Sequence, residues 1–512
     1  LTGGMLYHYD GFRLHENGFL GFPVFSAATG SSGGSIPEAT YLYRVVYEWY
    51  DDMGNVHRSA ASESESVETS GSTSKNTLTI YALQHTRKRE GAFTDTKTGL
   101  RACVYRTTAN GSVYHKIGSV NLSEEESNRV VTFVDYGGIN DTELLDNELL
   151  YTQAGLAANS FVGSCKDLCM HKERVFVTTS GNAVKFSKYM LGRDGVNFTD
   201  DGVVRVSSEK TSVNAIDSSR EALLILTGSD SYYVAGDGPD NAGVGSFTQP
   251  RMFAPGIGAV AGADHGQFSG GTLFQTNLGI INILPNLQPD YIGANIEDSV
   301  GGATVLSFLV TEDSSEVRLL LQNTASSSYS RFLVYNTLFK QWTTHDVTYA
   351  SSNYGVSAFV HGTDNGVYLS TADGNLHRYL FSKHTDDNTG SDVNYDMVVQ
   401  TGYLNVAGLQ SLQRVYRAMV LGTHVGNHTL SFDVYTDYDD STSSTFSKAL
   451  TSDANPYNYR VHLSNQKCRA VKVKITISGS SNAAVKLDGI ALEVGARPGT
   501  FKLPAAQTIG AS

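Results

Sequence analysis

The sequence predicts an all-β protein: a β-propeller of about six blades, with an inserted β-sandwich of the fibronectin-III or immunoglobulin type and a second, C-terminal β-sandwich. Three observations lead to this prediction. Paired apolar runs joined by polar turns recur at even spacing in the middle of the chain. Glycine (51 residues), tyrosine (28) and phenylalanine (22), which favour turns and strands, are abundant. Few long stretches show the apolar spacing of a helix.

The even spacing is the main reason to expect a propeller. With turn centres at residues 181, 229, 278, 326 and 374, the intervals are 48, 49, 48 and 48 residues. A repeat of about 40–50 residues with several short strands is typical of propeller blades, because a lone hairpin cannot bury its own apolar face. A sandwich or a β-helix with accidental spacing is the alternative. The predicted strand pairs are Val175–Thr178 with Ala183–Ser187, Leu223–Thr227 with Ser231–Ala235, Thr272–Thr276 with Ile280–Leu284, Val317–Gln322 with Arg331–Tyr335, and Val367–Ser370 with Leu376–Phe381.

Residues 1–36 form an N-terminal segment that we expect to join the propeller. Its first part is rich in tyrosine and phenylalanine, and Ala27–Ile36 looks like a Gly/Ser linker. Propellers often close by pairing strands from opposite ends of the repeat array, which leaves no open sheet edge. An added strand or hairpin from this segment would serve that purpose.

Residues 37–155 are the predicted inserted sandwich. Thr40–Tyr50 alternates, and one face carries the apolar side chains of Tyr41, Tyr43, Val45, Tyr47 and Trp49. Ala61–Lys75 is rich in Ser and Glu and is expected to be exposed. Asn110-Gly111 is a strong hairpin signal. The predicted strands are Thr40–Tyr50, Val56–Ala60, Asn76–Leu83, Arg101–Thr107, Ser112–Ile117 and Val130–Asp135.

Residues 156–391 are the predicted propeller, residues 392–497 the second sandwich, and residues 498–512 an extended or mobile tail. In the second sandwich Val471, Val473 and Ile475 alternate with lysines, which indicates a half-buried strand. The predicted strands are Met397–Leu404, Arg414–Leu421, Thr429–Tyr435, Tyr459–Leu463, Ala470–Ser478 and Ala484–Val494.

The net charge and the cysteine content argue against several classes of protein and of binding site. A net charge of −13 argues against wrapping nucleic acid by neutralising its phosphates, although DNA could pass an acidic wall without binding. Four scattered cysteines are too few for a disulfide scaffold. Cys165, Cys169 and His171 lack a nearby fourth metal ligand, so buried thiols are the simpler interpretation. We expect no membrane span and no export, because no long apolar run and no signal-peptide pattern is seen.

One group of acidic residues and one Gly-rich stretch resemble known sites. Asp437, Asp439 and Asp440 could bind Ca²⁺, but the twelve-residue loop with its Gly and terminal Glu is missing. Gly256–Val260 resembles a dinucleotide loop, but its third glycine is one position late and no strand–helix context surrounds it. We interpret the first as a solvated loop and the second as a tight turn between blades.

The last repeat contains residues that a glycosidase could use. Asp364, Asp373 and His377 lie near its turns, and a glycosidase needs two carboxylates across the scissile bond. Turn aspartates more often bond their own backbone. His345 and His361 have no nucleophile elbow nearby. The sequence therefore predicts no catalytic, cofactor-binding or metal-binding residues, no cofactor and no enzyme activity.

A basic cluster, His85–Arg89 followed by Glu90, is interpreted as a solvated loop at the tip of the inserted module. A contact with an acidic neighbour in an assembly is the functional alternative.

Several stretches in chain order resemble the tail nozzle proteins of short-tailed bacteriophages, a family also described as tail accessory or packaged-DNA stabilisation proteins. They are spread over most of residues 37–381. The stretches are Tyr41–Tyr47 with the turn Asp52–Asn55 and Arg58-Ser59, Val104–Thr108 before Asn110-Gly111, His171–Phe176, Leu223–Thr227 with Ser231–Val234, and Gly256–Ala261 followed by Leu273–Leu284.

The resemblance implies a structural virion protein that retains packaged DNA and guides its ejection. Six copies would form a ring around the DNA exit channel and dock to a tail adaptor protein, and the C-terminal sandwich could attach a fibre or spike. DNA would pass through the channel transiently and without sequence preference. The protein would be located in the virion tail and assembled in the host cytoplasm, and the family implies no catalytic residues.

Two other functions remain open. A secreted propeller that binds or cleaves glycans would have an axial pocket lined by aromatic residues and two or more carboxylates. A fibre-attachment adaptor of another phage tail is the third possibility.

Overall fold

The computed structural model describes residues 4–500 except for residues 82–85, 87, 89–98, 123–129, 191, 193, 207–211, 312–314, 324–329, 348–355, 362–365, 372–375, 381–382, 389–390, 409–410, 452–455, 464–466 and 480–482. The chain divides into two compact units. The first comprises Leu1–Arg318 and Tyr335–Trp342, and the second comprises Leu319–Val334 and Thr343–Ser512.

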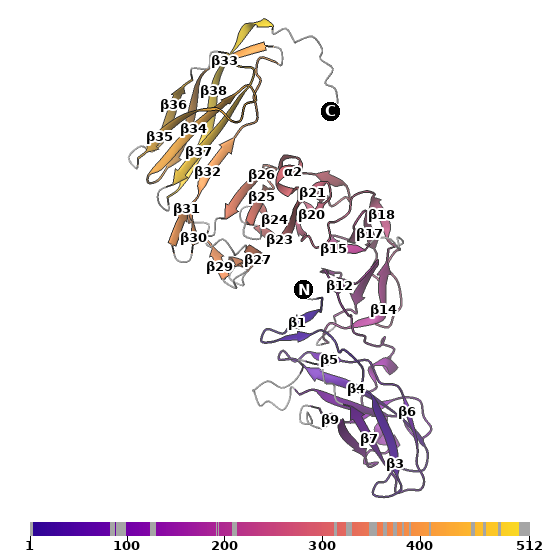
Figure 1. The fold of residues 1–512 in the computed structure, drawn as a ribbon. Helices are drawn as coiled ribbons and strands as arrows, with labels where there is room; N and C mark the ends of the chain where they lie inside the picture. The colour runs from indigo at the N-terminus through magenta and orange to yellow at the C-terminus, as the bar shows by residue number, and fades with distance from the viewer. Residues whose placement is uncertain are drawn as a thin grey trace, which may run out of the picture. The chain divides into compact units, whose positions relative to one another are not determined.

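The protein is all-β, and its middle part is a β-propeller of consecutive antiparallel sheets whose strands follow one another in chain order (Figure 1). Among the described residues there are four blades of four strands and one of three. They comprise β11 (Leu168–His171), β12 (Arg174–Thr178), β13 (Ala183–Ser187) and β14 (Phe198–Arg205); β15 (Val213–Ser219), β16 (Ala222–Thr227), β17 (Ser231–Ala235) and β18 (Arg251–Ala254); β19 (Gly266–Phe268), β20 (Gly271–Thr276), β21 (Gly279–Ile283) and β22 (Pro289–Tyr291); β23 (Ala303–Thr311), β24 (Glu316–Asn323), β25 (Ser330–Asn336) and β26 (Gln341–Val347); and β27 (Val356–His361), β28 (Val367–Thr371) and β29 (Leu376–Tyr379).

The five predicted hairpins are confirmed, and each forms the second and third strands of its blade. In the second blade the turn is closed by Thr227, whose amide donates to the Asp230 carbonyl at 2.9 Å. The Thr227 hydroxyl accepts the Asp230 amide at 3.0 Å, so a short polar sequence satisfies its own backbone groups. Local chemistry therefore sets the hairpins and their spacing.

Both faces of a blade are buried, which explains why its central strands are continuous apolar runs. In β16, Leu223 and Ile225 pack with first-blade residues that include Phe176. The alternate residues of β16, Leu224 and Leu226, pack with third-blade residues around Phe274. Because successive side chains of a strand point to opposite faces, one strand contributes to two inter-blade cores. Stacking of blades, and not the single hairpin, buries these side chains.

The first sandwich contains two sheets, with strand orders β10-β7-β3 and β5-β4-β8-β9, and β6 also pairs with β4. The predicted apolar face of β4 is confirmed, because Tyr41, Tyr43, Val45, Tyr47 and Trp49 are all buried in the core between these strands. The strands are β3 (Phe25–Gly30), β4 (Thr40–Tyr50), β5 (Val56–Arg58), β6 (Glu65–Glu68), β7 (Lys75–Tyr81), β8 (Arg101–Arg106), β9 (His115–Asn121) and β10 (Val130–Asp135).

Two expectations for the N-terminal third were wrong. The start of the expected linker Ala27–Ile36 is not a linker: Ala27–Gly30 lies in β3, which pairs with β7 and belongs to the first sandwich, because Phe25 and Ala27 pack in that core. The Ser/Glu-rich stretch is mostly exposed, as expected, and it contains β6, which pairs with β4. The segment 1–36 does not add a strand to a blade ladder in the described structure, since β1 (Tyr7–Tyr9) and β2 (Leu14–Glu16) form a two-stranded sheet of their own.

The N-terminal segment nevertheless contacts the first blade. Met5 forms an isolated bridge with Ser164, and the Cys165 amide donates to the Gly4 carbonyl at 2.6 Å. Leu6 is buried in a cluster with Val177 and other apolar side chains of that region. The segment therefore packs on the propeller through residues 4–6 while residues 25–30 join the sandwich.

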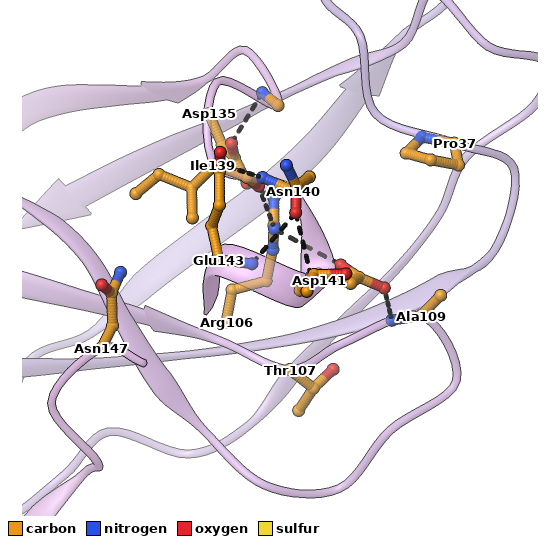
Figure 2. Close-up of polar contacts among 12 residues, drawn as sticks. Pro37, Arg106, Thr107, Ala109, Asp135, Ile139, Asn140, Asp141, Glu143 and Asn147 are labelled. Carbon is orange, nitrogen blue, oxygen red and sulfur yellow. Dashed lines mark hydrogen bonds and ion pairs between the residues drawn. The ribbon is translucent and has the colours of Figure 1, made fainter. Parts of the chain in front are cut away.

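A buried ion pair lies in the first sandwich (Figure 2). Arg106 Nη1 donates to Asp135 Oδ2 at 2.7 Å, and Arg106 Nη2 donates to the Ile139 carbonyl at 2.9 Å. The same carboxylate oxygen accepts the Tyr43 hydroxyl at 2.8 Å. Figure 2 shows the guanidinium reaching between Asp135 and Asp141, whose Oδ1 lies 3.6 Å from Nη2. The Arg106 guanidinium is thus held both by an ion pair with a carboxylate and by a hydrogen bond to a backbone carbonyl.

The second sandwich has sheets of order β32-β37-β34-β35 and β36-β33-β38, and its core is built from both. The predicted strands are present, but the sequence analysis missed β35 because most of its side chains are polar. The predicted tail begins too early, since β38 reaches Thr500 and pairs with Ser411 there. The strands are β32 (Asp396–Gln400), β33 (Ser411–His424), β34 (His428–Thr436), β35 (Ser443–Leu450), β36 (Tyr457–His462), β37 (Val471–Gly479) and β38 (Val485–Thr500), with a separate hairpin of β30 (Thr385–Asn388) and β31 (Ser391–Asn394).

Helices are short. They are α1 (Asp141–Leu144), α2 (Glu297–Val300), η1 (Tyr151–Ala154) and η2 (Ala294–Ile296). In the described part of the chain no helix has the length and apolar character needed to cross a membrane.

Candidate functional site

The inner strands of the propeller bring three carboxyl groups and a histidine together. β11, β15, β19 and β23 are the first strands of successive blades, and each contacts the next. Asp167 precedes β11, Asp217 lies in β15, and Asp264 and His265 precede β19. Residues one repeat apart in sequence therefore become neighbours. These four residues are called the inner-strand cluster.

Asp167 joins the first blade to the second. Its Oδ2 accepts the Ile216 amide of β15 at 2.7 Å, and its Oδ1 accepts the Leu168 amide at 2.8 Å. His265 Nε2 lies 3.5 Å from Asp167 Oδ2 and donates to the Ile216 carbonyl at 2.9 Å. Burial raises the pKa of Asp167, and it outweighs the opposing effects of His265 and of the two amides.

Asp264 joins the third blade to the fourth in the same way. Its Oδ2 accepts the Phe308 amide of β23 at 2.7 Å, and its own amide donates to the Val305 carbonyl at 2.8 Å. Burial raises the pKa of Asp264 against the lowering effect of the amide bonds and of His265. Two of the three carboxyl groups are therefore clamps between blades.

Asp217 is less completely bonded. Its Oδ1 accepts the Ser218 amide at 2.7 Å, whereas its buried Oδ2 has no partner in hydrogen-bond geometry among the described residues. Burial raises the pKa of Asp217, although His265 and the nearby Thr272 hydroxyl both favour its ionised form. The Thr272 hydroxyl is close enough for that effect but is itself without a partner in good geometry. Asp217 is therefore the cluster residue whose carboxylate has an oxygen, Oδ2, that could accept a further hydrogen bond.

Chemically, carboxyl groups with raised pKa values beside a histidine are the groups that general acid–base catalysis uses. The hydrogen bonds favour a structural role for Asp167 and Asp264, because an oxygen of each is occupied by an amide of the next blade. Asp217 and His265 are therefore the better candidates in the cluster for acid–base catalysis.

Replacing Asp217 by asparagine is expected to change how stability depends on pH. The folded-state pKa of Asp217 is raised above its ordinary value of 3.8, so the fold favours the protonated acid. The wild-type protein has that stability below the ordinary pKa and loses it as the pH rises through the folded pKa. In thermal melts from about pH 4 to about pH 7, the melting temperature of Asp217→Asn should rise relative to that of the wild type as the pH rises.

The control for this measurement is Asp290→Asn, a change at an exposed carboxyl of β22. Its melting temperature should keep a constant difference from that of the wild type. A constant difference for Asp217→Asn as well would contradict the raised pKa.

A cleft of about 490 Å³ lies beside β13, β14 and the loop 239–250. Its lining includes Lys188, Asp201, Asp240 and Phe247, together with the buried Arg174. The Arg174 guanidinium lies 3.7 Å from the centre of the Tyr189 ring. No residue of the inner-strand cluster lines this cleft, so its aromatic and charged groups do not combine with the cluster's carboxyl groups.

The residues weighed for a glycosidase site in the last repeat are placed as follows. Asp364 and Asp373 lie outside the described residues. His377 lies in β29 opposite Leu369 of β28, and His361 lies in β27. His345 packs its ring against Phe332 and Tyr395, 6.0 Å and 5.5 Å away between centres.

The aspartates in the second sandwich have partners in their own loop and in neighbouring segments. Asp440 Oδ1 accepts the Tyr403 hydroxyl at 2.7 Å and pairs with Lys472. Asp439 accepts the Ser441 amide at 2.8 Å. Asp437 accepts the Arg469 amide. Hydrogen bonds and an ion pair within the protein therefore account for these carboxylates.

The cysteines and the Gly-rich stretch also have structural surroundings. Cys165 is buried and Cys169 half-buried, both as free thiols, and His171 Nδ1 lies 2.8 Å from the Ser218 hydroxyl. The stretch Gly256–Val260 lies between the second and third blades, where the Ala259 amide donates to the Thr227 carbonyl at 2.8 Å. It is a turn between blades, as predicted.

The basic cluster was interpreted wrongly at Lys88, the one charged residue of that run that the structure describes. Its side chain is fully buried, where Nζ donates to the Gly18 carbonyl at 2.7 Å and lies 3.4 Å from Glu16 Oε1. Nζ also lies 5.1 Å from the centre of the Phe19 ring. A run of charges in sequence cannot show that one of them has an internal carboxylate partner.

Sequence reasoning missed the inner-strand cluster. One signal could have found part of it: Asp167 and Asp264 each lie 14 residues before the turn centres 181 and 278. An acidic residue at the same distance from the turn centre in two repeats indicates a position that contacts the next blade. Asp217 lies 12 residues before its turn centre at 229, so the distance is not strict.

No family model and no curated protein matches this chain. Among solved structures, the chain is similar to an exo-β-1,3-galactanase from Phanerochaete chrysosporium, at 10% identity and a TM-score of 0.27, over 66% of this chain and 98% of the galactanase. A protein from Bacteroides uniformis assigned as a 6-phosphogluconolactonase matches at 9% identity and a TM-score of 0.31, over 69% of this chain and 97% of that one. At such values neither match carries an argument about activity.

Proposed function

We propose that this chain is a structural subunit of a ring-shaped assembly and that it turns over no substrate. In its specific form the proposal is the nozzle of a short-tailed phage, which retains packaged DNA and guides its ejection. The sequence resemblance to nozzle proteins supports this specific form. Its partners would be further copies of the chain, with six in the ring, a tail adaptor above it, and a fibre or spike.

The observation that carries the proposal is a run of exposed apolar side chains at the N-terminal hairpin and just after it. Phe12 is 71% exposed, Tyr9 64% and Val24 57%. Leu14, Leu20 and Phe22 in the same stretch are also exposed. Concentrated apolar exposure of this kind marks an interaction surface. The occupant that we infer is a second copy of this chain, because a ring needs one such patch per subunit to meet its neighbour.

Two further features fit a mechanically rigid structural subunit. Stacked apolar faces and the clamps of Asp167 and Asp264 tie successive blades together. The net charge of −13 disfavours tight binding of DNA, which a channel wall must let slide. Both features fit a rigid conduit.

The double substitution Phe12→Ser with Phe22→Ser is expected to weaken ring formation strongly. Burying one phenylalanine contributes about 1.5–3 kcal/mol, which corresponds to roughly 10–100-fold in an association constant. Mass photometry and negative-stain images of the full chain, alone and with its adaptor, should show rings for the wild type and mostly single subunits for the variant. The matched control is Phe339→Ser, because Phe339 is 69% exposed in the turn before β26.

Equal loss of rings in the control would contradict the assigned surface. A wild-type chain that stays a single subunit even with the adaptor would contradict the proposed function itself.

A glycan-cleaving or glycan-binding propeller is the second candidate, and the inner-strand cluster favours it. The raised pKa of Asp217, which lies beside His265, suits this carboxyl group to protonating a leaving group. A hydrolase screen with polysaccharides tests it. Activity that disappears in Asp217→Asn would support this candidate and displace the first.

A further inference from the structure

Three possible metal ligands meet where the N-terminal hairpin touches the first sandwich. His8 lies in β1, Asp51 directly follows β4, and His57 lies in β5. One ligand atom from each lies within 4.8 Å of the others, and no other such group is found in the described part of the chain. The Asp51 and His57 side chains are 0% and 4% exposed, and that of His8 is 26% exposed.

The distances are those of ligands around an ion. Asp51 Oδ2 lies 3.3 Å from His57 Nε2 and 3.5 Å from His8 Nε2. Good N–H···O hydrogen bonds span about 2.7–3.2 Å, so the His57 contact is a long hydrogen bond, and the His8 contact lacks hydrogen-bond geometry. In a tetrahedral site with bonds of about 2.1 Å, neighbouring ligand atoms are about 3.4 Å apart. The two contacts therefore match two edges of such a tetrahedron.

We propose that His8, Asp51 and His57 bind a divalent transition-metal ion, best matched by Zn²⁺, which fastens the N-terminal hairpin to the first sandwich. Two imidazole nitrogens and one carboxylate oxygen are a ligand set that zinc accepts, with a water in the fourth position. The partial exposure of His8 leaves a path for the ion and for that water.

The three ligands are held in place by their surroundings. Asp51 Oδ1 accepts the amides of Met53 at 3.0 Å and Asn55 at 2.7 Å, and the Asn55 side chain donates to Oδ2 at 2.8 Å, so the carboxylate is held with Oδ2 facing the histidines. The His57 ring packs against Trp49, 5.1 Å away between centres. His8 Nε2 is buried and has no hydrogen-bond partner among the described residues. An ion would supply that missing partner.

Neutral imidazole and ionised carboxylate are the forms in which histidine and aspartate bind a metal ion. Another charged group near the site is Asp10, which accepts the Asp52 amide at 3.2 Å.

The ion would have a structural consequence. A two-stranded hairpin is marginal by itself in water. The β1–β2 hairpin is otherwise tied to the sandwich by contacts such as Arg13 Nε to Asp52 Oδ2 at 3.4 Å. A metal bond from His8 to Asp51 and His57 would fix the segment that carries the exposed Phe12.

The test uses the full chain, stripped of metal with a chelator and titrated with Zn²⁺ alone by calorimetry. We expect one bound ion per chain and a higher melting temperature with Zn²⁺. Loading with Co²⁺ instead should give the visible absorption of a tetrahedral site. His8→Ala removes a partly exposed ligand and should lower the affinity about 100-fold or more, since even outer-sphere changes cost 10–100-fold.

The matched control is His462→Ala, at an exposed histidine of β36 in the second sandwich, and it should leave Zn²⁺ binding unchanged. His57→Asn is a second variant, with folding checked by circular dichroism. Failure of the wild type to bind Zn²⁺, or undiminished binding by His8→Ala, would overturn the proposal. Ring formation is a separate readout, so loss of one proposal does not decide the other.

Discussion

Asp135→Asn is expected to lower the free energy of unfolding of the first sandwich by about 3 kcal/mol, the range seen when one partner of a buried ion pair is removed. Arg106 is 2% exposed and Asp135 7% exposed, so neither charge is hydrated in the fold. Arginine cannot escape by losing its proton. Its charge would remain buried beside the Tyr43 hydroxyl and a neutral amide.

Cys103 can report this unfolding without interference from the rest of the chain. It lies on β8 with Arg106, it is fully buried, and its burial raises the pKa of the thiol to about 12. Alkylation of Cys103 in increasing urea, followed by peptide mass spectrometry, should shift to lower urea in the variant. A local reporter is needed because a chain with several domains has no single unfolding free energy.

Asp141→Asn is the matched control for Asp135→Asn. Asp141 also faces Arg106, but at 3.6 Å and with 36% of its side chain exposed, so the change should cost about 1 kcal/mol or less. Replacing the pair together, by Arg106→Met with Asp135→Leu, should recover most of the loss, because no charge is then left unpaired. Equal effects of the two asparagine variants would show that burial does not set the energy.

Gly258→Ala should destabilise the propeller by about 3 kcal/mol, at the upper end for overpacking. A Cβ at this position would lie 2.4 Å from both the Thr227 carbonyl oxygen and the Ser229 amide nitrogen. These are backbone atoms of the second blade's hairpin turn, so no side chain can move aside. The close approach explains a glycine in the stretch between the second and third blades.

Gly228→Ala is the control, in the turn that Gly258 touches. A Cβ there would meet the Asn214 amide group at 3.4 Å, an ordinary contact. Urea-dependent alkylation of the buried Cys165 reports on the first blade and the segment before it. A Gly258→Ala protein that resists urea as well as Gly228→Ala would contradict the tight packing between these turns.

The sequence alone determined the hairpins, their spacing and the two sandwiches. Five pairs of apolar runs around turns such as 228–230 became the central strands of five blades. The alternation in Thr40–Tyr50 placed five side chains in a core correctly. These features depend on residues close in sequence, where turn chemistry and two-residue periodicity act directly.

Tertiary structure decided which distant segments meet and which charges lose water. Phe25–Gly30 became a sandwich strand only because β7 offers it an edge. Lys88 is buried because Glu16, far away in the chain, neutralises it. The inner-strand cluster and the His8–Asp51–His57 group likewise exist only once blades and hairpin pack. Pairing across such separations depends on the sum of many contacts, and no local pattern in the sequence encodes that sum.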